Sequence, residues 1–205
     1  EKTSLRILKA IDRKEKIGIF GDYDVDGASS TALLGNYFKL IKQDFEIYIP
    51  DRQSEGYGPS IKSFQKLINQ KVSLIITVDC GTMSFEAIDF ANSKNIDVIV
   101  LDHHQSEINL PKAFSIINPN RIDDSSNLNY LCAAGICFMT LISLNTLLRK
   151  SNWFRKKKIK EPDLINFLDL VSLGTICDVV PLIGLNRAIV KQGLKIINLK
   201  KNLGL

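Results

Sequence analysis

Acidic residues and histidines follow three short apolar runs of this chain, each at the point where the run ends. These junctions lie at Ile17–Phe20 before an Asp-rich segment, at Leu74–Val78 before Asp79, and at Ile96–Leu101 before Asp102, His103 and His104. Short β-branched runs bounded by turn residues are typical of buried parallel strands. The carboxyl ends of such strands share one edge of a sheet, which faces the ligand crevice. The sequence therefore predicts a cluster of carboxylates and imidazoles at one sheet edge.

Strand and helix patterns alternate along the first half of the chain. Besides the three runs above, the predicted elements are strands over 45–49 and 114–117 and helices over 28–42, 59–69, 84–94, 132–150, 162–173 and 186–199. Repeated strand–helix–strand units of this length are typical of α/β proteins. We expect a mostly parallel sheet flanked by helices on both faces, followed by a helical C-terminal portion.

Cysteine usage and hydropathy bear on the cellular compartment. The four cysteines form no C-x-x-C pair, which favours reduced, mostly buried thiols. No signal peptide is visible, and we expect a cytoplasmic protein. The uncharged segment 132–148 contains several hydroxyl and amide side chains and is at the short limit for a membrane span. A buried core helix is the better interpretation, so no membrane partner is expected.

The charge balance indicates an anionic partner. The net charge is +5, although the predicted site is acidic. Basic residues must therefore lie elsewhere, notably in the run from Arg155 to Lys160. A basic exterior around an acidic centre suits a polyanionic substrate. A solvated lysine-rich loop is the alternative for this run.

The segment from Asp22 to Gly27 carries three carboxylates on alternate residues, Asp22, Asp24 and Asp26. Such carboxylates repel one another unless a cation lies between them. A calcium-binding EF-hand loop is disfavoured, because its twelfth position would be Leu33 instead of Glu and because a strand precedes it. A structural capping role is a further alternative. A catalytic metal site accounts best for the pattern.

Three further positions extend this interpretation. Asp79 is a candidate ligand, with capping of the following helix as the alternative. His103 and His104 are the only histidines of the chain, and imidazole in a carboxylate-rich site favours Mn²⁺ over Ca²⁺. Asp178 stands alone in an apolar segment, where a carboxylate is costly unless it is paired or bound to metal. Helix capping is the alternative for Asp178.

Taken together, these segments resemble the DHH phosphoesterase family, which is named for the triplet found here at 102–104. The shared segments, in family order, are 21–27, 50–58, 78–81, 102–104, 132–135 and 174–182. They span most of the chain. The EGYG segment at 55–58 and the GTICDV segment at 174–179 indicate the single-strand-specific exonuclease branch of the family.

The resemblance implies a site with two divalent cations, Mn²⁺ or Mg²⁺. The implied metal ligands are Asp24, Asp26, Asp79, His103 and Asp178, with Asp79 bridging the ions. Asp22 is an additional candidate, because Phe20 stands where other branches of the superfamily carry a histidine. His104 would contact the scissile phosphate, beside Asp102. The implied substrate-binding residues are Arg52, Gly56, Tyr57, Gly58 and Gly135.

The expected function is therefore a two-metal exonuclease that hydrolyses single-stranded DNA from 5′ to 3′ into 5′-mononucleotides, in DNA repair and recombination. Single-strand-binding protein and a helicase are further expected partners, and the oligomeric state is open. One alternative is a phosphodiesterase of the same family acting on oligoribonucleotides or cyclic dinucleotides. Another is a non-catalytic scaffold. We expect residues 1–205 to be one DHH phosphoesterase domain of a longer protein, because the family's second domain and OB-fold are not found in this sequence.

Overall fold

The computed structural model describes residues 1–202 and 204, so the expected domain end at 205 lies outside the described residues. Its centre is a five-stranded sheet of order β2-β1-β3-β4-β5, with every pair parallel. The strands are β1 (Ile17–Phe20), β2 (Phe45–Tyr48), β3 (Leu74–Val78), β4 (Asp97–Leu101) and β5 (Ser115–Ile117). The predicted parallel sheet is confirmed.

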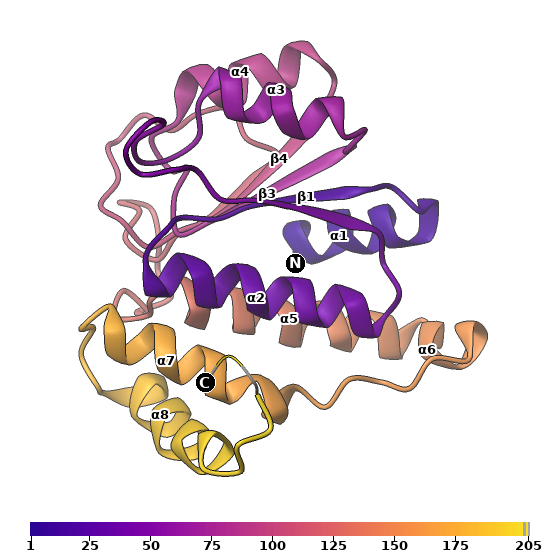
Figure 1. Ribbon diagram of the computed structural model, residues 1–205, viewed down its shortest axis with the longest axis vertical. Coiled ribbons are helices and arrows are strands. Elements are labelled where there is room, and N and C mark those ends of the chain that lie inside the picture. The colour runs from indigo at the N-terminus through magenta and orange to yellow at the C-terminus, as the bar shows by residue number, and fades with distance from the viewer. Residues whose placement is uncertain (203, 205) are drawn as a thin grey trace.

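Helices cover both faces of the sheet, also as predicted (Figure 1). They are α1 (Lys2–Arg13), α2 (Val25–Leu40), α3 (Ile61–Asn69), α4 (Phe85–Ser93), α5 (Ala133–Lys150), α6 (Trp153–Lys157), α7 (Leu168–Cys177) and α8 (Gly184–Ile197), with a 3₁₀ turn η1 (Leu164–Phe167). Helices α3 and α4 lie on one face, and α1, α2 and α5 lie on the other. Helix α7 packs against α2 and α5, and α8 packs on the outer side of α7; the two form the helical C-terminal portion.

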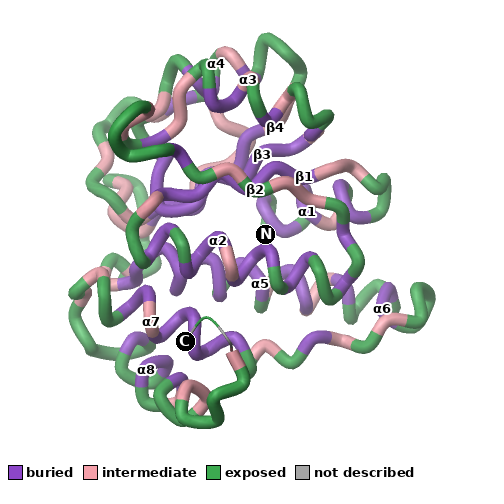
Figure 2. Tube along the Cα trace, viewed as in Figure 1, coloured by how far each residue is buried: buried purple, intermediate pink, exposed green. Residues whose placement is uncertain are grey.

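The two faces of the sheet bury separate apolar clusters. All five residues of β3 are buried, as the continuous apolar runs of parallel strands require. Much of α5 is buried between the sheet and α7 (Figure 2), which agrees with its interpretation as a core helix. Among the described residues, no helix combines the length and the hydropathy that crossing a membrane requires.

Three regions differ from the sequence prediction. The helix predicted over 162–173 is instead the 3₁₀ turn η1 followed by α7, which begins at Leu168 and continues to Cys177. Helix α1 was not predicted, although Ile7, Ala10 and Ile11 provide a buried face at helical spacing. The basic run, expected to be a loop, instead begins in α6, where Trp153 and Phe154 are buried and anchor the short helix. The many charged residues from Arg155 onward indicate an exposed loop, so the sequence pattern does not show that the two preceding aromatic residues are buried.

The strand order places a topological switch at β1. The chain pairs β1 with β2 on one side and then crosses to pair it with β3 on the other. Ligand sites of open α/β sheets form at such a point, beyond the carboxyl ends of the strands. The segments after β1, β3 and β4 meet there.

Candidate metal centre

The segment after β1 carries the three alternating carboxylates into the start of α2. Asp24 precedes the helix, and its carboxylate accepts a hydrogen bond from the Gly27 amide at 2.8 Å, so it does cap α2. Asp26 lies in the first turn and is 1% exposed. Its two carboxylate oxygens accept hydrogen bonds from the amides of Ala133 and Ala134 at 2.6 and 3.0 Å. The positive end of α5 therefore holds Asp26 in place.

Asp79 follows β3 in a left-handed backbone conformation, with φ of 62°. Few non-glycine residues adopt it, and Asp is among the more tolerant ones. The Asp79 amide donates to the Leu101 carbonyl at 2.9 Å, and the Tyr57 hydroxyl donates to the Asp79 carbonyl at 3.0 Å. Ser84, not Asp79, is the residue that precedes α4. The helix-capping alternative for Asp79 is therefore wrong.

Asp102 follows β4 and is fully engaged by hydrogen bonds. One carboxylate oxygen accepts from the amides of His103 and His104 at 2.8 and 3.2 Å, and from the His104 imidazole Nδ1 at 2.8 Å. The other oxygen accepts from the Thr82 amide at 3.0 Å. Asp102 thus fixes the shape of the loop that carries both histidines.

The imidazole of His103 lies at the centre of the carboxylate cluster. Its Nε2 is 3.1 Å from Asp79 Oδ1, 3.8 Å from Asp26 Oδ2 and 3.6 Å from Asp178 Oδ2. Asp178 directly follows α7. Three segments that are far apart in sequence therefore place carboxylate oxygens around one imidazole, which a fourth segment carries.

A glycine in α7 allows this close approach. A Cβ atom on Gly174 would lie 2.5 Å from Asp26 Oδ1 and 2.8 Å from the Ala134 side chain. No larger residue fits between the helices without a shift. Helix α7 can therefore bring Asp178 to the cluster only because position 174 lacks a side chain.

The side chains form three groups that share members. Within each group, the three ligating atoms lie within 4.8 Å of one another. These groups are Asp79 with His103 and His104, Asp26 with His103 and Asp178, and Asp22 with Asp24 and Asp79. Asp79 belongs to two groups and His103 to two. All six predicted metal ligands are therefore brought together, with His104 beside them.

Unsatisfied oxygens test whether this donor set fits divalent cations. Asp22 Oδ1, Asp79 Oδ2 and Asp178 Oδ2 are buried and have no hydrogen-bond partner among residues 1–202 and 204. A buried carboxylate oxygen without a partner is costly. Carboxylate oxygens with one imidazole nitrogen are the donors that Mn²⁺ and Mg²⁺ accept. The residues therefore fit a pair of such cations.

The electrostatics of the cluster point the same way. Burial raises the pKa of Asp79 well above its usual value, and the neighbouring carboxylates of Asp26 and Asp24 raise it further. Burial likewise raises the pKa values of Asp22, Asp26 and Asp178. A bound cation would relieve both the desolvation and the repulsion.

The pKa of Asp102 shifts in the opposite direction. Burial alone would raise the pKa of Asp102, but hydrogen bonds from His104 and Thr82 outweigh burial and leave it below the usual range. The same hydrogen bond, which His104 Nδ1 donates to the Asp102 carboxylate, raises the pKa of His104. Asp102 therefore orients His104 and favours its protonated form, which suits contact with an anionic phosphate.

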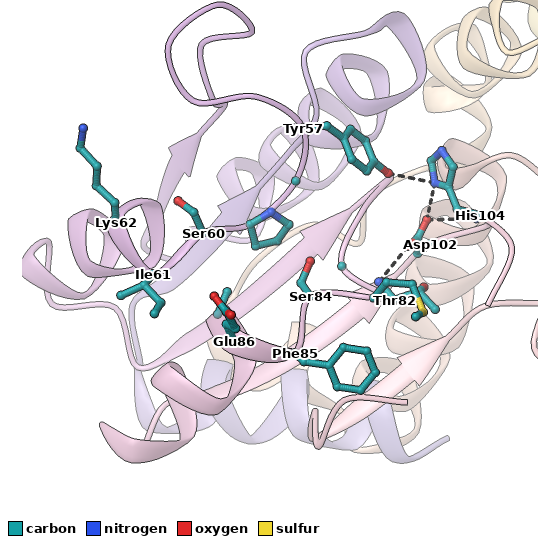
Figure 3. A pocket seen from close by; sticks show the side chains of 15 residues that line it. Tyr57, Ser60, Ile61, Lys62, Thr82, Ser84, Phe85, Glu86, Asp102 and His104 are labelled. Carbon is teal, nitrogen blue, oxygen red and sulfur yellow. Dashed lines mark hydrogen bonds and ion pairs between the residues drawn. The ribbon is translucent and has the colours of Figure 1, made fainter. Parts of the chain in front are cut away.

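A groove of about 820 Å³ opens beside His104, between the starts of α3 and α4 (Figure 3). Tyr57 and Gly58 line it, and the Tyr57 hydroxyl lies 3.1 Å from His104 Nδ1. The guanidinium of Arg52 lies over the Tyr23 ring, 5.4 Å from its centre. Two of the predicted substrate-binding residues therefore line the groove.

The other two predicted glycines lie in different surroundings. Gly56 adopts a positive φ of 76° in the same loop as Tyr57. Gly135 is buried within α5, where a Cβ atom would lie 3.3 Å from the Leu131 side chain. Neither residue lines the groove.

Two asparagines that the sequence prediction missed hold the histidine loop. The Asn118 side-chain amide donates to the His104 carbonyl at 2.8 Å and to Thr82 Oγ1 at 2.9 Å. The Asn120 side chain donates to the His103 carbonyl. Their sequence signal was the Asn-Pro-Asn segment after β5, which the sequence prediction interpreted only as the end of a strand.

Residues 16–175 match the DHH family, N-terminal domain. The chain belongs to the DHH family. Its DHH triplet is the segment at 102–104, and the cluster described above lies at the strand ends of this DHH domain.

Curated relatives and a solved structure extend the comparison. The chain is 37% identical over 187 residues to the single-stranded-DNA-specific exonuclease RecJ of Dickeya dadantii, covering 91% of this chain and 32% of that protein. It is 37% identical over 195 residues to the RecJ of Escherichia coli, covering 95% and 34%. A crystal structure of exonuclease RecJ bound to manganese matches with a TM-score of 0.78 and 30% identity, covering 95% of this chain and 47% of that one. The chain thus spans about a third of the length of these curated relatives.

Proposed function

We propose that this chain is the catalytic DHH domain of a RecJ-type exonuclease that hydrolyses single-stranded DNA from 5′ to 3′. The observation that carries the proposal is the convergence of the Asp26, Asp79 and Asp178 carboxylates on the His103 imidazole at the sheet switch point. The same cluster holds buried carboxylate oxygens that have no hydrogen-bond partner among the described residues. The names and the similarity of the RecJ relatives support the choice of substrate.

Asp22, Asp24, Asp26, Asp79, His103 and Asp178 would hold two divalent cations, Mn²⁺ or Mg²⁺. When bound, such cations neutralise phosphate charge and lower the pKa of a coordinated water. The protein positions the ligands before any substrate arrives, because α5 amides hold Asp26 and the Tyr57 hydroxyl holds the Asp79 backbone. This preorganisation lowers the cost of assembling the charged site.

His104 would contact the scissile phosphate. The hydrogen bond to Asp102 involves Nδ1, so Nε2 is the imidazole nitrogen left for substrate. The raised pKa of His104 favours the protonated form, which stabilises negative charge on a phosphate oxygen. Asp102 acts through His104, as an orienting group.

The groove between α3 and α4 would receive the strand on one side of the scissile bond. Its wall carries the aromatic ring of Tyr57, which is 54% exposed. An exposed ring of this kind can stack on a base without sequence preference. Lys62 adds a cation to the same groove, which suits the phosphate backbone.

The test measures Mn²⁺ binding and hydrolysis for three proteins. They are the unmodified chain, Asp79→Asn, and Asp89→Asn as a matched control, because Asp89 lies on the exposed side of α4. The substrates are 5′-phosphorylated single-stranded DNA, the corresponding duplex, and dinucleotides. We expect release of 5′-mononucleotides from single strands, no activity for Asp79→Asn, and unchanged activity for the control.

Other outcomes would reject parts of the proposal. Faster cleavage of dinucleotides would indicate the small-substrate branch of the family. Mn²⁺ binding without hydrolysis of any substrate would indicate a non-catalytic scaffold. Full activity of Asp79→Asn would contradict the two-cation assignment itself.

Several expectations stay predictions. These are the role in DNA repair and recombination, the cytoplasmic location, and the partnership with single-strand-binding protein and a helicase. We also propose that the chain is one domain of a longer exonuclease, in view of the share of its relatives that it spans.

A further inference from the structure

A second hollow lies at the opposite edge of the sheet from the metal centre. It has a volume of about 400 Å³ and lies between the end of α1, the turn before β2, and α6. Its apolar lining comes from Ile11, Ile41, Trp153 and Ile159. We call this hollow the back pocket. Nothing in the proposed hydrolysis uses it.

Three exposed lysines form the rim of the back pocket, Lys14, Lys42 and Lys157. None of them forms an ion pair with any residue in the described part of the chain. Asp44 is the one acidic residue of the lining. The pocket therefore presents unpaired positive charge around an apolar interior.

The basic run from Arg155 to Lys160 lies beside this pocket and contributes two of its lining residues. Lys157 ends α6 within the run, and Ile159 lines the pocket from the following turn. The metal centre lies at the other end of α5, where Ala133 contacts Asp26. Since α5 has 18 residues, the two sites are separated by about 27 Å of helix.

The surface of the pocket does not suit nucleic-acid bases. Trp153 is 6% exposed and packs edge-on against Phe154, with ring centres 5.5 Å apart. A single strand binds proteins by stacking its bases on exposed aromatic faces, and the back pocket offers none. An aliphatic side chain can fill such a hollow, and carboxylates can pair with lysines at its rim.

We propose that the back pocket binds an acidic peptide segment of a partner protein, with one bulky aliphatic side chain in the apolar interior and its carboxylates at Lys14, Lys42 and Lys157. Charge complementarity supplies the attraction and the pocket supplies the selectivity. The basic run extends the cationic surface along the peptide. This site is separate from the hydrolytic centre and independent of its activity.

The chain provides its own reporter, because Trp153 is its only tryptophan and lines the pocket. Three probes are titrated in the absence of metal: an acetylated peptide of four glutamates and a leucine, the same peptide with serine in place of leucine, and oligothymidylate. We expect saturable change of tryptophan fluorescence with the leucine peptide and at least tenfold weaker binding of the serine peptide.

Charge-reversal variants locate the site. The double variant Lys42→Glu with Lys157→Glu should weaken binding of the leucine peptide at least tenfold. The matched control is Lys191→Glu with Lys195→Glu, which changes the net charge equally on the exposed side of α8 and should bind as the unmodified chain does. Circular dichroism verifies that all variants are folded.

Three results would overturn the proposal. Equal affinity for the leucine and serine peptides would show that the apolar interior of the pocket does not bind the aliphatic side chain. This comparison needs no protein variant. If both double variants bound the leucine peptide equally weakly, net charge alone would account for the binding. Tighter fluorescence-detected binding of oligothymidylate would assign the surface to nucleic acid.

Discussion

The ends of β3 and β4 lie side by side, and each carries a buried aspartate with a different task. Asp79 and Asp102 are both 1% exposed. Asp102 receives four hydrogen bonds from protein groups and has a lowered pKa. Asp79 has a carboxylate oxygen without a partner in the described residues and a raised pKa. Burial alone therefore does not identify a ligand.

The two aspartates differ in how their carboxylates are stabilised: hydrogen bonds within the protein stabilise Asp102, whereas Asp79 needs a bound cation. The protein satisfies Asp102 by itself, so that residue contributes to the structure whether or not a cation is present. Asp79 is destabilising until a cation arrives. Substituting the two residues should therefore change stability in opposite directions.

The largest effect should come from removing each charge in turn. Asp79→Asn should weaken Mn²⁺ binding by more than the roughly 10–100-fold typical of residues that only support ligands, while raising the melting temperature of the metal-free chain. Asp102→Asn should lower that temperature, because its amide cannot accept all four hydrogen bonds. Calorimetry of binding and thermal melts measure both. Shifts of the same sign would contradict the comparison.

The next largest effect should come from a substitution at Gly174, where α7 packs closely against Asp26. Gly174→Ala would push its methyl group against Asp26 and Ala134. We expect a loss of about 1–3 kcal/mol in the free energy of unfolding, and Mn²⁺ binding weakened by displacement of Asp178. Ile176→Ala, on the partly exposed side of α7, is the control and should retain Mn²⁺ affinity. Unchanged affinity of Gly174→Ala would indicate that α7 tolerates the shift.

A smaller effect should follow from loosening the histidine loop. Asn118→Ala removes the hydrogen bonds to the His104 carbonyl and to Thr82. We expect Mn²⁺ affinity and kcat to fall about tenfold, with a smaller change in KM for single-stranded DNA. Asn92→Ala removes a comparable bond from Asn92 to the Lys112 carbonyl away from the site, and should leave all three values unchanged.

The smallest effect should appear in the pH dependence of the metal-free chain. The folded-state pKa values of Asp26, Asp79 and Asp178 are raised, so the unfolded chain ionises first as the pH rises and stability falls. The raised pKa of His104 acts in the same direction. We expect a melting temperature several degrees lower at about pH 8 than at about pH 5. Mn²⁺ should reverse the trend at the higher pH, and Asp79→Asn should flatten it.

The strand ends were predictable because parallel strands buried on both faces leave a clear apolar signature. The run at Leu74–Val78 is entirely buried, and the polar residue after such a run must face the open edge of the sheet. Asp178 was predictable for a related reason, since a lone carboxylate in an apolar segment needs a partner. These inferences needed only local sequence.

The missed features depend on contacts with the backbone. Asn118 and Asn120 both donate to main-chain carbonyls of the histidine loop, which every residue possesses, so the Asn-Pro-Asn segment alone does not reveal which groups its side chains bind. The amides of α5 that hold Asp26 are likewise invisible until the two helices are packed together. Helix α6 has only five residues, too few for periodicity to register.

The scattered origin of the ligands has a mechanical consequence. Asp26, His103 and Asp178 lie on segments far apart in the chain, yet their ligating atoms lie close enough to share one ion. A bound ion would therefore act as a reversible cross-link between the outer helical layer and the sheet, closing two long loops at once. Resistance of the α7–α8 layer to proteolysis should then follow the concentration of free divalent metal.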